Sequence, residues 1–181
     1  MGATTEHRKL SFQSLDQAVA EAERLAGGEV RTTGKHSFGQ ILEHLARTHD
    51  MATGKLVGPK PPFYVRLMMP LLKSMIIKDV KPGYKLPSKA EAFFWPDQEF
   101  DVADALQHLR ESVENFKTNG PLEKHPVFGK LSPEQTLELN CKHCARCIWG
   151  SCTRCDPLTC FAQQELRRPA NPWRCISQTA P

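Results

Sequence analysis

Residues 137–160, with the sequence LELNCKHCARCIWGSCTRCDPLTC, decide how the fold of this chain is interpreted. Six of the seven cysteines lie in this stretch, and the seventh is Cys175. Paired thiolates at C-x2-C spacing can hold zinc or an iron–sulfur cluster, which would indicate a small metal-binding module. The alternative is that the stretch begins as the end of a helix. We favour the helix, because Cys141, Cys144 and Cys147 follow at three-residue steps that would spread around it rather than converge.

A strong helix start stands just before this stretch. Ser132 precedes Pro133, so serine takes the N-cap and proline takes the first helical position. Glu134 adds an acidic group to the first turn, where the helix dipole favours negative charge. The sequence therefore predicts a last helix that begins at Pro133 and continues through His143 and beyond.

Three other segments show helical spacing of apolar residues after a capping residue. The clearest signal is the pair Ser37 and Gln40, which matches a capping box. No alternating strand pattern and no internal repeat is visible in the sequence. We therefore predict an all-α fold, most simply an up-and-down bundle of four main helices. The first three helices are expected over residues 15–26, after Ser14, over residues 38–50, and from Asp97 or Asp101 to about residue 118.

The segment between the second and third of these helices is the least regular part of the sequence. Residues 63–77 are apolar nearly all round and contain Pro70, which predicts one or two short helices. We expect them to pack into the core or to form a lid, with a partner-binding or membrane-surface segment as the alternative. Residues 79–96 contain three prolines and Gly83, and are expected to be irregular surface structure.

Composition excludes several classes of protein. The chain has 181 residues with 40% hydrophobic and 24% charged residues, which is sufficient for one domain with a core. The net charge of +4 is mild, and no basic stripe interleaves with aromatic residues, so we expect no nucleic acid partner. No run of eighteen apolar residues and no secretory signal is present, so we expect no membrane partner and a cytoplasmic location. In that compartment, clustered cysteines indicate metal or redox chemistry rather than disulfides.

Three stretches resemble a known family. The chain is similar, over roughly residues 8–145, to a bacterial domain family of unknown function within the DinB/YfiT-like superfamily of four-helix-bundle metalloenzymes. HPVFGKLSPEQ is the most specific of the matching pieces. The stretches that carry the resemblance are LSFQSLDQAVAEAERL at 10–25, TTGKHSFGQILEHLART at 32–48 and HPVFGKLSPEQ at 125–135.

The resemblance implies a divalent metal, such as zinc or nickel, held by three histidines. One histidine stands on the second helix, and His44 matches it. Two stand four residues apart on the last helix, where His143 matches the first and Cys147 occupies the place of the second. Thiolate is itself a metal ligand, so two histidines and one cysteine form an alternative ligand set. The family further implies hydrolysis, or transfer to a low-molecular-weight thiol, acting on a small-molecule substrate, and a homodimer.

The departure at Cys147 suggests a change of reading frame. When residues 145–155 are back-translated and read from each third codon base, the degenerate codons permit Ala-Leu-His-Leu-Gly-Phe-Val-His-Pro-Val. Trp149 followed by Gly150 forces GGG in that frame. We hypothesise a small insertion or deletion near codons 144–146, which would leave a bundle domain over residues 8–147 and an irregular cysteine-rich tail over residues 148–181.

Other side chains are interpreted as structural. Glu43 and Asp50 lie near His44 in sequence, but nothing in the pattern aims them at a substrate. Two further functions compete with a metal-dependent enzyme: a cysteine-cluster module that binds zinc or iron–sulfur, and a catalytically inactive helical protein. The histidines that we expect not to bind metal are His36, His49, His108 and His125.

Overall fold

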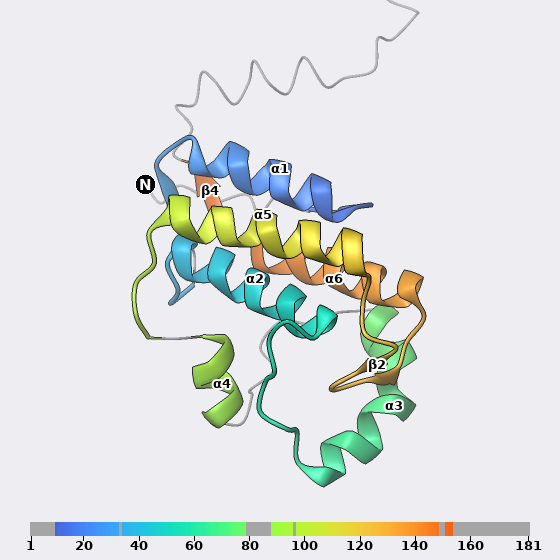
Figure 1. Cartoon of the computed structure of the whole chain (residues 1–181). Coiled ribbons are helices and arrows are strands. Elements are labelled where there is room, and N and C mark those ends of the chain that lie inside the picture. The colour runs from blue at the N-terminus through green and yellow to red at the C-terminus, as the bar shows by residue number, and fades with distance from the viewer. Residues whose placement is uncertain (1–9, 33, 79–87, 96, 149–150, 154–181) are drawn as a thin grey trace, which may run out of the picture.

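The computed structural model describes residues 10–32, 34–78, 88–95, 97–148 and 151–153. Helices dominate this part of the chain, so the predicted all-α class is confirmed (Figure 1). The helices are α1 (Leu15–Ala26), α2 (Phe38–Thr53), α3 (Phe63–Lys78), α4 (Ser88–Phe94), α5 (Val102–Asn119) and α6 (Pro133–Ile148). The short strands are β1 (Val30–Thr32), β2 (Lys124–His125), β3 (Gly129–Lys130) and β4 (Ser151–Thr153).

Four helices, α1, α2, α5 and α6, pack around one apolar core, and each contacts two of the others (Figure 1). The expected up-and-down order is wrong in one respect, because α2 and α5 run in the same direction. His108 of α5 bonds Glu43 of α2, and further along both helices Asn115 bonds Thr53. The long connection through α3 and α4 permits this parallel pair, since it returns the chain to the end where α2 began.

The helix starts follow the local rules read from the sequence. The Ser14 hydroxyl accepts from the N–H of Gln17, and Ser37 with Gln40 forms the full capping box. Asp101, one of the two expected starts, caps α5 by accepting from two backbone N–H groups. Each such cap satisfies N–H groups that have no partner inside the helix, and contributes about 1 kcal/mol.

Each bundle helix buries the stripe that its periodicity predicts. Leu25 of α1, Leu45 of α2 and Leu109 of α5 are almost fully buried, as is Ile148 at the end of α6. Burying side chains of this size contributes about 1.5–3 kcal/mol each. Ile148 belongs to the core, so α6 remains a packed helix through all of its last turn.

The connection between α2 and α5 departs from expectation. Residues 63–78 form one helix, α3, which contains Pro70, and its Ile77 is buried against Leu131 and Leu139. The expectation that this segment packs into the core is wrong for one face of α3, because Phe63 and Leu71 are 81% and 77% exposed. Part of the segment expected to be irregular forms the short helix α4.

Two small antiparallel sheets tie the ends of the bundle. β2 and β3 form a hairpin at the start of the HPVFGKLSPEQ region, with Gly129 at positive φ. β1 pairs with β4, so that Arg31 lies opposite Cys152. The proposed tail therefore contributes one strand to the fold, and its residues 154–181, with Cys155, Cys160 and Cys175, lie outside the described part of the chain.

Candidate metal centre

The structure brings the three predicted ligands together. His44 projects from α2, and His143 and Cys147 lie one turn apart on α6, so that both face the same neighbour. Their ligand atoms all lie within 4.8 Å of one another, and the two histidine Nε2 atoms are 3.1 Å apart. Among the described residues, these three side chains form a group that could hold a metal ion, and we refer to them as the three-residue group. Their role as ligands remains a prediction.

A backbone carbonyl fixes the orientation of His44. The ring Nδ1 lies 3.1 Å from the carbonyl oxygen of Phe94, which can only accept a hydrogen bond. Nδ1 must therefore carry the proton, and the lone pair of a neutral ring lies on Nε2, the atom that faces His143. Histidines that bind metals commonly donate their other ring N–H in this way, which fixes the tautomer.

An aromatic wall backs the same histidine. The Trp95 ring stacks on His44 with centroids 3.8 Å apart, and on its other face stacks on His36 at 4.0 Å. The Phe94 ring meets His44 edge-on. The stacked and edge-on contacts hold the His44 imidazole in place, and the Trp95 ring covers one of its faces.

Phe93 and Gln98, which lie on either side of these aromatic residues in the sequence, are hydrogen-bonded to side chains of α2. Gln40 donates to the carbonyl of Gln98, and Arg47 donates to the carbonyl of Phe93. His44 lies between Gln40 and Arg47, so three side chains along one face of α2 bind the main-chain carbonyls of Phe93, Phe94 and Gln98. Sequence reasoning missed this support, because bonds to main-chain carbonyls do not depend on the identity of residues 93–98.

Burial sets the protonation of the centre. Desolvation, reinforced by His143, holds the pKa of His44 well below its usual value, and desolvation lowers the pKa of His143 to about 4. Both rings are therefore neutral at pH 7, as metal ligands must be. Desolvation also raises the pKa of Cys147 to about 12, so its thiol is protonated until a cation replaces the proton.

Two other cysteines of α6 point elsewhere, as expected for a continuing helix. Cys144 is fully buried and its Sγ lies 3.5 Å from Nε2 of His49, while Cys141 is buried in the same core. Burial lowers the pKa of His49 to about 3, and its Nδ1 has no hydrogen-bond partner among the described residues. Neither cysteine is grouped with Cys147 as a ligand, which argues against a cluster built from the first three thiols.

The remaining histidines have structural partners. His125 accepts at Nδ1 from the backbone N–H groups of Val127 and Phe128, which shapes the β2–β3 hairpin. Burial lowers its pKa to about 4, so this acceptor is unprotonated at neutral pH.

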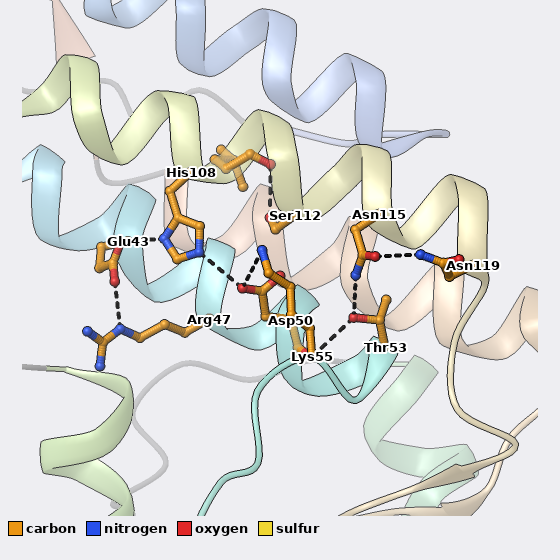
Figure 2. A network of polar contacts seen from close by, with 10 residues as sticks. Glu43, Arg47, Asp50, Thr53, Lys55, His108, Ser112, Asn115 and Asn119 are labelled. Carbon is orange, nitrogen blue, oxygen red and sulfur yellow. Dashed lines mark hydrogen bonds and ion pairs between the residues drawn. The ribbon is translucent and has the colours of Figure 1, made fainter.

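On the face of α2 toward α5, Figure 2 shows His108 between two carboxylates. Its Nδ1 lies 2.7 Å from Glu43 and its Nε2 lies 3.0 Å from Asp50. Arg47 also donates to Glu43, and Lys55 lies 3.4 Å from Asp50. Glu43 and Asp50 are thus engaged with His108 of α5 rather than with the three candidate ligands. Their spacing of seven on α2 is the signal that could have revealed a shared partner.

Comparison with known proteins places the chain in a family. A family model described as "Protein of unknown function (DUF1569)" matches residues 4–148 and ends where α6 ends. The chain therefore belongs to the DUF1569 family. No curated protein and no solved structure matches it. The family description assigns no activity, so a function must be argued from the site itself.

Proposed function

We propose that the protein is a divalent-metal-dependent enzyme whose metal is held by His44, His143 and Cys147. The observation that carries the proposal is the pair of neutral histidines whose Nε2 atoms lie 3.1 Å apart, beside a thiol, with one ring oriented by a main-chain carbonyl. Two histidine nitrogens and one thiolate suit zinc, and nickel is also compatible with such ligands. Resemblance to the DinB/YfiT-like superfamily supports the same site.

The centre offers three protein ligands, which leaves one tetrahedral position for water or substrate. A metal bound there would polarise a carbonyl or lower the pKa of bound water or of a thiol. The chain contributes the rest of the chemistry. Phe94 and Trp95 hold His44 in one orientation, and Cys147 releases its proton when it becomes a ligand.

The reaction class follows from what stands near the centre. Glu43 and Asp50, the carboxylates closest in sequence to His44, are held by His108, so we assign no side-chain general base. A reaction whose nucleophile is activated by metal coordination fits this arrangement. We therefore propose hydrolysis of a small-molecule substrate, or transfer to a low-molecular-weight thiol, in the cytoplasm and by a homodimer.

Metal content tests the proposal most directly. The purified full chain should bind about one equivalent of zinc or nickel after dialysis, measured by mass spectrometry of the metal. His44→Ala should lose it, because only two protein ligands would remain. His36→Ala is the matched control, since this histidine stacks on the same Trp95 but lies outside the three-residue group.

Two outcomes point to the competing functions. If Cys152→Ser with Cys155→Ser removes the metal while His44→Ala retains it, the chain is a thiolate module. If no variant and no wild-type sample retains zinc or nickel, the bundle is a catalytically inactive helical protein. A wild-type chain that loads metal through His44 then justifies screening ester and amide hydrolysis and thiol transfer.

A further inference from the structure

Helix α3 presents an apolar face that the described part of the chain leaves uncovered. Phe63, Leu67 and Leu71 are 81%, 69% and 77% exposed, and they recur on one side of the helix. Exposed apolar residues occur singly on most proteins, but a contiguous row of large ones marks an interaction surface. The other large exposed side chains on this face are Tyr64, Met68 and Met75.

The structure holds α3 by its opposite face and its C-terminal end. Ile77 is buried, and Lys142 of α6 donates to the carbonyls of Ile77 and Lys78. Lys73 donates to the carbonyl of Lys130 in the β2–β3 hairpin. Figure 1 shows that the N-terminal end of α3 extends away from the four bundle helices. The apolar face is therefore presented by a helix that is anchored along its other side.

The charge of the residues around this apolar face indicates which kind of partner would bind it. Between Asp50 and Asp79 the sequence has five basic residues and no acidic residue. Four of the five are exposed, and they stand on α3 and on the loop that leads into it: Lys55, Lys60, Arg66 and Lys78. A second copy of the chain would bring this basic segment against its like, which opposes association. Lys55 lies 3.4 Å from Asp50, and an anionic surface gains from the charges of the other three.

The length of α3 determines whether it would span a lipid bilayer or lie in its surface. In the part of the chain that the structure describes, no helix is long and apolar enough to cross a membrane. At 16 residues α3 is about 24 Å long, shorter than the roughly 30 Å hydrocarbon layer. A short helix with large apolar residues and flanking basic residues suits the interface, where it lies in the plane of the lipid headgroups.

We propose that α3 binds the protein to anionic lipid surfaces, with its apolar face inserted at the headgroup boundary and its basic residues on the phosphates. The proposal departs from the sequence-based expectation of no membrane partner, which was drawn from the absence of a spanning segment. It does not depend on the metal centre, because none of the three candidate ligands lies on α3.

Vesicle flotation with the full chain tests this assignment. Wild-type protein should float with vesicles of phosphatidylcholine containing about 30% phosphatidylserine, and at least tenfold less should float with phosphatidylcholine alone. Leu71→Glu should lower binding to the anionic vesicles at least tenfold. Thr118→Glu is the matched control, since it adds the same charge at an exposed position on α5 and should bind like the wild type.

Other results would overturn the assignment. Equal binding to neutral and anionic vesicles would show that the basic residues do not contribute to binding. No binding to either kind of vesicle would show that a lipid surface is not the partner of α3. A wild-type dimer that Leu71→Glu converts to a monomer, in a protein that binds no vesicles, would show that a second copy covers α3. Circular dichroism of Leu71→Glu should match the wild type, because this side chain is exposed.

Discussion

His108 and Glu43 join the two parallel helices of the bundle through a 2.7 Å contact between Nδ1 and Oε2. Asp50 takes the other ring nitrogen, so one imidazole spans two carboxylates on α2. Although His108 is partly buried, the hydrogen bonds and charges of these carboxylates raise its pKa above the usual value. The bonds of His108 and Arg47 lower the pKa of Glu43 against the opposing effect of burial. We call the contacts of His108 with Glu43 and Asp50 the clamp. Since Glu43 precedes His44, the clamp also holds in place the helix that carries the first candidate ligand.

The clamp predicts that the free energy of unfolding falls on both the acid and the alkaline side of a pH window. The raised pKa of His108 means that its contribution is fully present below its unfolded pKa and is lost as pH rises through the folded value. The lowered pKa of Glu43 has the opposite sign, so its contribution is present above the unfolded value and is lost as pH falls through the folded one. We expect the free energy of unfolding to decline by about 1 kcal/mol on each side of this window.

Urea denaturation of metal-free protein across the pH range measures this dependence. His108→Gln keeps hydrogen-bonding capacity but cannot become charged, so its stability should lose the decline on the alkaline side. His36→Gln is the control, because His36 makes no contact with a carboxylate among the bonds described and its pKa is lowered rather than raised. An unchanged alkaline decline in His108→Gln would show that another group is responsible.

A close approach at the start of α2 gives a second prediction. A Cβ added to Gly39 would overlap the carbonyl oxygen of Phe100, just before α5 begins. Gly39→Ala should therefore destabilise the protein by about 2 kcal/mol, despite the better helix propensity of alanine. The midpoint of urea unfolding measures the effect. Gly34→Ala meets no atom within 4 Å and should change stability by less than about 0.5 kcal/mol.

The sequence predicted those parts of the fold that depend on neighbours along the chain. Ser37 and Asp101 cap helices through bonds to residues two or three positions away, so their signals are local. The candidate ligands were found through the family resemblance. Two of them, His143 and Cys147, are one helical turn apart, so that their proximity was also a local signal. What the sequence could not reveal depends on distant contacts: the Phe94 carbonyl that orients His44 and the parallel order of α2 and α5. The exposure of α3 was also hidden, because an apolar run has the same composition in a core and on a surface.

The Cys147 thiol gives a third prediction, which concerns metal-free protein. Desolvation raises its pKa to about 12, so very little thiolate exists at neutral pH. Because the thiolate is the reactive form, alkylation of Cys147 by iodoacetamide at neutral pH should be at least about a hundredfold slower than in urea-unfolded chain. Peptide mass spectrometry resolves this cysteine from the others. Rapid labelling of the folded, metal-free protein would instead make Cys147 a ready nucleophile and would favour thiol chemistry without a metal.

The reading-frame hypothesis predicts the codons of the gene. A small insertion or deletion near codons 144–146 requires that codons 145–155, read from each third base, encode Ala-Leu-His-Leu-Gly-Phe and remain open beyond them. Resequencing the DNA across codons 138–160 measures this. Tyrosine codons at the histidine positions, or an early stop in that frame, would reject the hypothesis and make the cysteine-rich tail genuine.

The fifth prediction asks whether Cys147 stands where a third histidine belongs. The side chain at this position faces His44 and His143 from one turn along α6, with ligand atoms within 4.8 Å. Cys147→His should therefore bind nickel at least as tightly as the wild type and should release no thiol proton, so that its affinity depends less on pH. Cys147→Ser offers only a weak oxygen ligand and should bind zinc and nickel at least about tenfold more weakly. Isothermal titration of both metals at two pH values separates these effects. If Cys147→Ser binds both metals as tightly as the wild type, the thiol is not a ligand.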